Sequence, residues 1–142
     1  MNAMLESWNG QWLRPAAPDF FAIEAEEHVD AAHRCLAALA GAGDPAAGLL
    51  LNDLISELRG LKVDAEAVGH GAVYTMGDGL EMLFEHILED GLRFREEMID
   101  LAEAVLRTVA SLVRAPGPAD RWDGIVECST AVRGLEVVRR SA

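Results

Sequence analysis

The histidines are the first residues of this chain that could carry chemistry, because imidazole binds metals and exchanges protons near neutral pH. A carboxylate-bridged metal pair inside a helical bundle needs a Glu-x-x-His motif on each of two helices. No histidine of this chain follows a glutamate by three residues. The sequence therefore predicts no metal centre at its histidines, which are His28, His33, His70 and His86.

Cysteine and glycine motifs give no sign of catalysis either. Cys35 and Cys128 lie far apart in the sequence, outside any CxxC motif or His/Cys cluster, and we interpret them as two reduced, packed thiols. The segments GAG and GDG have neither the P-loop nor the dinucleotide-binding spacing. We therefore predict a protein that is not an enzyme and that has no cofactor.

The most distinctive residue is Lys62, the only lysine of the chain, which follows Arg59 by three positions. Residues three apart are neighbours on the surface of a helix. If the leucines of this segment face inward, Arg59 and Val63 point outward, and other residues lie on the flank. The outward side of this segment and its flanks together carry Ile55, Ser56, Arg59, Lys62, Val63 and Glu66.

Helices must position these residues, because apolar side chains recur every three or four positions over most of the chain. The hydrophobic fraction is 51%, the aromatic fraction is only 6%, and no strand pattern competes. Breaks rich in glycine and proline, such as GAGDP and APGP, separate the helical segments. The predicted helices cover about 19–40, 46–68, 72–89, 93–113 and, more weakly, 120–139. Asp19 is the predicted N-cap of the first helix, and Gly69 and Gly71 are predicted to end the second.

At 142 residues the chain is expected to form one domain. Four helices of similar length with short breaks predict an all-α, antiparallel up-down-up-down four-helix bundle. The predicted organisation is a short N-terminal leader (1–18), the bundle (19–114) and an extra C-terminal helix (119–142) that packs on the bundle or on a partner.

The net charge of −12 excludes duplex nucleic acid as a partner, because phosphate binding needs a basic face. No segment is apolar over the roughly 18 residues that a membrane span requires. The N-terminus lacks the basic start and apolar run of a signal peptide. We therefore predict a cytoplasmic protein that binds neither nucleic acid nor membrane.

Three segments resemble the first three helices of the histidine phosphotransfer (HPt) domain of chemotaxis kinases. They are FAIEAEEHVDAAHRCLAAL (21–39), LNDLISELRGLKVDAEAVG (51–69) and MGDGLEMLFEHI (76–87). In that family a histidine of the second helix accepts a phosphoryl group and passes it to an aspartate of a response-regulator receiver. A lysine three residues later offsets the charge of the phosphate, and a histidine and a glutamate of the third helix lie beside the phosphoacceptor.

Position by position, the resemblance places Arg59 at the phosphoacceptor and Asp78 at the second histidine, and it keeps Lys62 and Glu81. A guanidinium stays protonated and is a poor nucleophile. The resemblance therefore implies a degenerate HPt-like module that docks a response-regulator receiver or a histidine-kinase domain without carrying phosphate. The predicted contact surface for this partner comprises Ile55, Ser56, Arg59, Lys62, Val63 and Glu66. It also implies an ion cluster of two bases against two acids, with Arg59 able to approach the acidic pocket of a receiver as a cation.

Other interpretations stay open. The ion cluster could be a surface salt bridge at a former phosphotransfer site that no longer has a function, instead of part of a docking face. The chain could be a structural or oligomerising helical-bundle protein, with its leader and last helix buried against a second copy in a homodimer. An enzyme or a small-ligand binder would instead use a cavity in the bundle.

Overall fold

The computed structural model describes residues 18–91, 96–114 and 122–141, and every regular element in these ranges is an α-helix. The all-α prediction is therefore confirmed. The leader, apart from Pro18, and the predicted start of the fourth helix lie outside the described residues. None of the described helices combines the length and the apolar character needed to cross a membrane. The helices are α2 (Pro18–Leu39), α3 (Asp44–Val68), α4 (Gly71–Glu89), α5 (Glu96–Arg114) and α6 (Trp122–Ser141).

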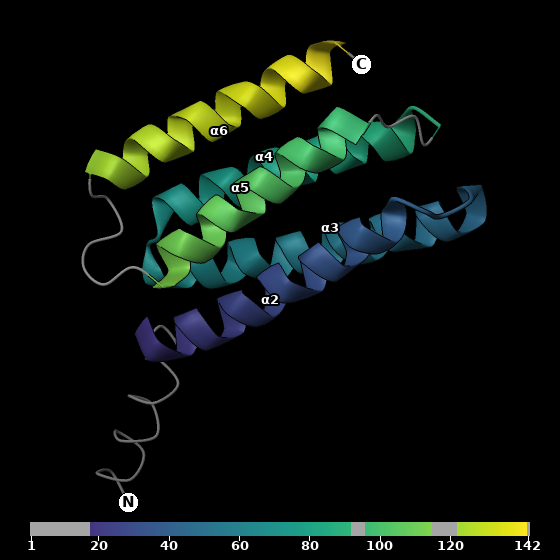
Figure 1. Cartoon of the computed structure of the whole chain (residues 1–142). Helices are drawn as coiled ribbons and strands as arrows, with labels where there is room; N and C mark the ends of the chain where they lie inside the picture. The colour runs from purple at the N-terminus through teal and green to yellow at the C-terminus, as the bar shows by residue number, and fades with distance from the viewer. Residues whose placement is uncertain (1–17, 92–95, 115–121, 142) are drawn as a thin grey trace, which may run out of the picture.

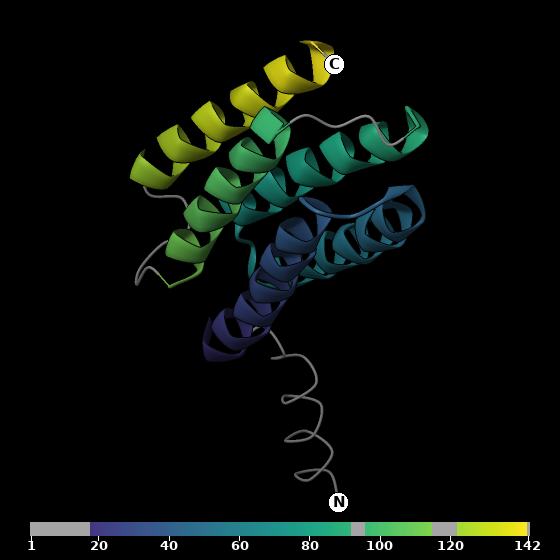
Figure 2. The ribbon, with the colours of Figure 1, turned by 45° about the vertical axis from the view of Figure 1, so that its right-hand side comes forward.

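Consecutive helices run in opposite directions, as Figure 1 shows. Helices α2, α3, α4 and α5 close a ring in which each helix packs against the next and α5 returns to α2. Helix α6 packs along α4 and α5, on the side away from α2 and α3 (Figures 1 and 2). The described part of the chain thus forms the predicted bundle with an extra C-terminal helix.

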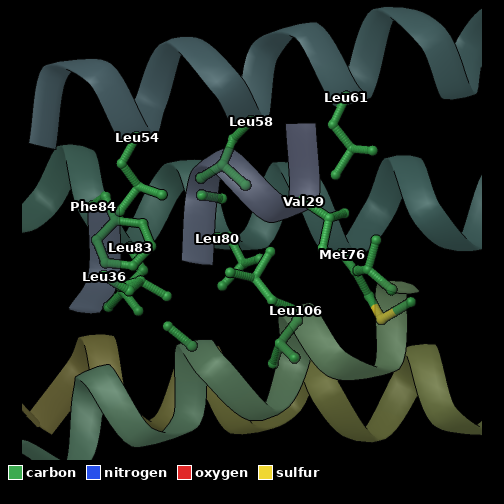
Figure 3. Close-up of a cluster of buried hydrophobic side chains, with 14 of the residues drawn as sticks. Val29, Leu36, Leu54, Leu58, Leu61, Met76, Leu80, Leu83, Phe84 and Leu106 are labelled. Carbon is green, nitrogen blue, oxygen red and sulfur yellow. The ribbon is translucent and has the colours of Figure 1, made fainter. Parts of the chain in front are cut away.

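The leucine seam of α3 builds the core. Leu54, Leu58 and Leu61 are buried, and they point toward buried side chains of α4 and α5 such as Leu80 (Figure 3). Burying one leucine stabilises the fold by about 2 kcal/mol relative to leaving it exposed, so the spacing of the leucines decides which side of α3 faces inward. The side that remains outside carries Arg59.

The turn between α3 and α4 shows why α3 ends where it does. Gly69 has a φ of 71°, a left-handed conformation that glycine adopts without steric cost. The His70 N–H donates to the Ala65 carbonyl at 2.8 Å, as in a Schellman motif, and the Val73 N–H donates to His70 Nδ1 at 3.3 Å. The prediction of Gly69 as a helix stop is confirmed, whereas Gly71 is wrong as a stop because it begins α4.

The start of α2 also differs from the prediction. The helix begins at Pro18, so Asp19 lies in its first turn and does not precede it as a cap. Proline suits the first turn, because its missing N–H would have no intrahelical partner there.

Candidate docking site on helices α3 and α4

Two cations of α3 are paired with three carboxylates of α4. Lys62 Nζ lies 2.7 Å from Asp78 Oδ1 and 3.1 Å from Glu81 Oε1. Arg59 donates through Nε to Glu81 Oε2 at 3.1 Å and through Nη2 to Glu85 Oε1 at 2.9 Å. The structure thus brings together the four residues of the predicted ion cluster and adds Glu85. We call these five residues the α3–α4 ion network.

Helical spacing produces this network. Arg59 and Lys62 are one turn apart on α3, and their partners occupy successive turns of the antiparallel helix α4. Glu81 is the bridge, because each of its carboxylate oxygens contacts a different cation. The Glu81 side chain is 12% exposed, whereas that of Arg59 is 62% exposed. The network therefore runs from a mostly buried centre to an exposed rim.

Burial and pairing act in opposite directions on the centre of the network. Burial alone would raise the pKa of Glu81, but hydrogen bonds, led by that from Lys62, outweigh burial and lower this pKa. Burial alone would lower the pKa of Lys62, but its hydrogen bonds to Asp78 and Glu81 outweigh burial and raise it. The hydrogen bond to Glu81 is the main cause that raises the pKa of Arg59. Both bases stay protonated at neutral pH, so neither acts as a nucleophile.

Lys62 is held along its length by α4. A Cβ atom added at Gly77 would lie 3.2 Å from Lys62 Cγ, so the missing side chain at Gly77 leaves room for the lysine stem. Lys62 Nζ also lies 5.3 Å from the centroid of the Tyr74 ring, within the range of a cation–π interaction. The ammonium group is thus satisfied by contacts within the protein.

The predicted contact surface is only partly available to a partner. Val63 is 65% exposed, and Ser56, Arg59 and Glu66 are exposed as well. Ile55 is 4% exposed and belongs to the hydrophobic core, so its prediction as a contact residue is wrong. The reason is that α3 packs against both α2 and α4 and buries a wider stripe than the leucine seam alone.

A second polar contact, on the other flank of α3, was missed by sequence reasoning. His28 of α2 lies between two carboxylates of α3, with Nδ1 2.7 Å from Glu57 Oε2 and Nε2 3.3 Å from Asp64 Oδ2. The sequence holds one sign of this contact, which is Gly60 in the interior of a long helix. Sequence reasoning also missed Glu85, although it lies one helical turn after Glu81 and pairs with the same arginine.

The described residues offer little for a small ligand or a metal. A groove of about 460 Å³ lies open on the surface between α4 and α6. No cluster of His, Cys, Asp and Glu in the described ranges is arranged to hold a metal ion. The groove mixes both charge signs, and its lining residues are Met82, Glu85, His86, Glu89, Arg139 and Arg140.

Comparison with protein-family models, with curated proteins and with solved structures finds no match for this chain. The fold and the site define the protein at the level of class, as an all-α helical bundle with an ion network between α3 and α4. The resemblance to HPt domains stays a prediction that rests on three sequence segments.

Proposed function

We propose that this chain is a non-catalytic, HPt-like protein-binding module, which docks a response-regulator receiver or a histidine-kinase domain without carrying phosphate. The observation that carries the proposal is the α3–α4 ion network. Arg59 stands where the resemblance places the phosphoacceptor, and its guanidinium is bound to Glu81 and Glu85. A protonated, hydrogen-bonded guanidinium does not attack phosphorus. The surface around it is therefore suited to binding and not to transfer.

The docking part of the proposal rests on the exposed surface around Val63. This apolar side chain is 65% exposed and has exposed polar residues, Ser56, Arg59 and Glu66, on the same helix. An apolar centre with a polar rim is typical of small protein interfaces. The ion network also fixes the side chains of its cations before binding, which lowers the entropy lost when a partner docks.

Titration calorimetry with purified receiver and histidine-kinase domains tests docking. Val63→Asp should weaken binding at least about tenfold, or about 1.4 kcal/mol, because it places a charge at the apolar centre. Val137→Asp is the matched control, since Val137 is 61% exposed but lies on α6, outside the ion network. A partner whose affinity ignores the change at Val63 would show that the proposed face is wrong.

Phosphoryl transfer is tested separately. Incubation with a phosphorylated kinase or receiver should leave this chain unlabelled, and an acid-labile label on it would refute the non-catalytic part of the proposal.

Sedimentation velocity tests the oligomerising alternative. A stable dimer that protects the segment around Val63 from hydrogen exchange would favour that alternative over docking.

A further inference from the structure

The outer side of α3 carries a row of residues at heptad spacing. Leu49, Ser56 and Val63 follow one another at intervals of seven residues, which places them nearly on one line along the helix. Leu49 is 70% exposed, Val63 is 65% exposed, and Ser56 between them is exposed as well. We call these three residues the outer row. At 1.5 Å per residue the row is about 21 Å long, so a partner helix of about three heptads can follow it, as in a coiled coil.

A groove lies beside the outer row, on the side of α2. It has a volume of about 300 Å³ and is open to solvent between α2 and α3. Ser56 lines the groove and also belongs to the outer row, so the two features form one continuous surface. The other lining residues combine apolar and charged side chains, and they are Ala31, Arg34, Cys35, Leu50, Asp53 and Glu57.

The carboxylates of the groove are available to a cation. Asp53 is exposed and forms no ion pair with any residue that the structure describes. Glu57 lies one turn further along α3 and uses only Oε2 in its contact with His28. Arg34 is the one base among the lining residues, and neither carboxylate is paired with it. The groove therefore holds two carboxylates against one base.

The thiol of Cys35 responds to this excess of negative charge. Burial is the main cause that raises the pKa of Cys35, and the charges of Asp53 and Glu57 raise it further. The charge of Arg34 lowers this pKa, but its effect is the smallest of the four. The charges around the thiol are therefore negative on balance.

The other side of the outer row is different. There the ion network presents carboxylates that are already bound to Arg59 and Lys62. A cation from a partner would compete with these two bases for the network, but it would meet no such competitor at Asp53. The groove side is therefore where α3 can select the charge of a partner.

We infer that α3 binds a basic amphipathic helix of a protein partner, whose apolar side chains cover the outer row and whose lysine or arginine enters the groove between α2 and α3. The stem of such a side chain lies along Leu50, and its charged end reaches Asp53 and Glu57. A second copy of this chain, which also has a net charge of −12, would be repelled. This inference deepens the proposed docking function and rests on it, because it names the chemistry that a partner needs on this face.

The probe is a synthetic helical peptide of about three heptads, with leucine at the a and d positions and lysine on both flanks. Titration calorimetry should show binding to the full chain, and the same peptide with glutamate in place of lysine should not bind. Asp53→Asn should weaken binding about fivefold. The matched control is Asp100→Asn, which removes one exposed charge from α5 and should leave the affinity nearly unchanged. Equal weakening by the two variants would show a general attraction between charges and would overturn the inference.

The outer row is tested by Leu49→Gln. This change should weaken binding of the lysine peptide about fivefold, because an apolar contact is lost. Val137→Gln is the matched control, since Val137 is 61% exposed on α6. A peptide that binds the Leu49 variant as tightly as the natural chain does not lie on the outer row.

The natural protein allows a further test through its two thiols. Saturating lysine peptide should slow the alkylation of Cys35 by iodoacetamide at least about threefold, because it covers the groove. Cys128 is the internal control and should react at an unchanged rate, since it lies on α6, 3.6 Å from the Ala72 carbonyl. Equal rates for Cys35 with and without peptide would overturn the inference. So would a Cys35 that becomes protected at high protein concentration without peptide, which would assign the groove to a second copy.

The peptide and the proposed partner domains can fail separately. If a receiver or kinase domain binds and the lysine peptide does not, the inference is wrong and the proposed docking function stands. If the peptide binds as expected and neither domain binds, the proposed function is wrong in its partner, and the basic-helix site stands.

Discussion

Replacing Gly60 with alanine should destabilise this protein, although the same change stabilises most helix interiors. Alanine is favoured over glycine in a helix by about 1 kcal/mol. At Gly60, however, the new methyl group would lie 2.5 Å from His28 Cε1, so the ring has to leave its place. Its contacts with Glu57 and Asp64 are then lost.

The expected size of the destabilisation follows from the contacts that the ring of His28 would lose. The hydrogen bond between the ring and the Glu57 carboxylate contributes about 2 kcal/mol, as hydrogen bonds to charged groups do. Its loss outweighs the gain in helix propensity of about 1 kcal/mol. The net loss is about 1 kcal/mol, or about 3 °C in Tm. Gly48→Ala is the matched control on the same helix, since nothing lies within 4 Å of a Cβ atom there. It should raise the Tm by about 3 °C.

Urea unfolding followed by circular dichroism measures both variants, and a double-mutant cycle isolates the ring. In a His28→Ala background, Gly60→Ala should become stabilising, because the methyl group no longer displaces an imidazole. If Gly60→Ala stabilises the natural protein as much as Gly48→Ala does, the ring does not pack on Gly60 and the reasoning fails.

Three further predictions concern the ion network and the thiols. Lys62→Ala should lower the free energy of unfolding in urea by about 1 kcal/mol, and by more than Arg59→Ala does. The reason is that the lysine pairs with the mostly buried Glu81 from a mostly buried position, whereas the side chain of Arg59 is 62% exposed. Equal losses of stability in the two variants would contradict this. The pKa of Glu81 is lowered in the folded state, so its carboxylate stabilises the fold at any pH above the ordinary pKa of a glutamate, and this stabilisation is lost as the pH falls through the lowered pKa. Glu81→Gln should therefore flatten the loss of Tm below about pH 4. A variant whose Tm falls as steeply in acid as that of the natural protein would contradict this. Burial raises the pKa of Cys35 and of Cys128, which lowers the fraction of reactive thiolate. Iodoacetamide should therefore alkylate both thiols at least about tenfold more slowly in the folded chain than in urea, as measured by mass spectrometry. Equal rates would mean that the fold does not protect the thiols.

Much of the fold could be predicted, because it follows from the spacing of apolar residues within single helices, whereas the pairing of α3 with α4 in the ion network was implied by the resemblance. The leucines of α3 define its inner face, and Arg59 and Lys62 follow from that face as outer or flanking residues. Ile55 could not be placed in this way. Whether a flanking residue is buried depends on how closely α4 approaches, and the sequence of α3 alone does not contain that distance.

The His28 contact lay beyond sequence reasoning for a related reason. It joins α2 to α3, and it depends on the register between the two antiparallel helices. That register is set by core packing along the whole pair and not by any residue of the contact itself. Gly60 was a visible sign that something approaches α3 closely, but a glycine does not say which residue approaches.

The ion network also changes what a docking surface at this place can use. The prediction that Arg59 approaches an acidic receiver pocket as a cation assumed a guanidinium whose charge is available. In the structure that charge is shared with Glu81 and Glu85, and the network as a whole has three carboxylates against two bases. An acidic pocket would be repelled by this surface, and the arginine would first have to leave two partners. The proposed docking would therefore depend on an apolar contact at Val63 more than on charge.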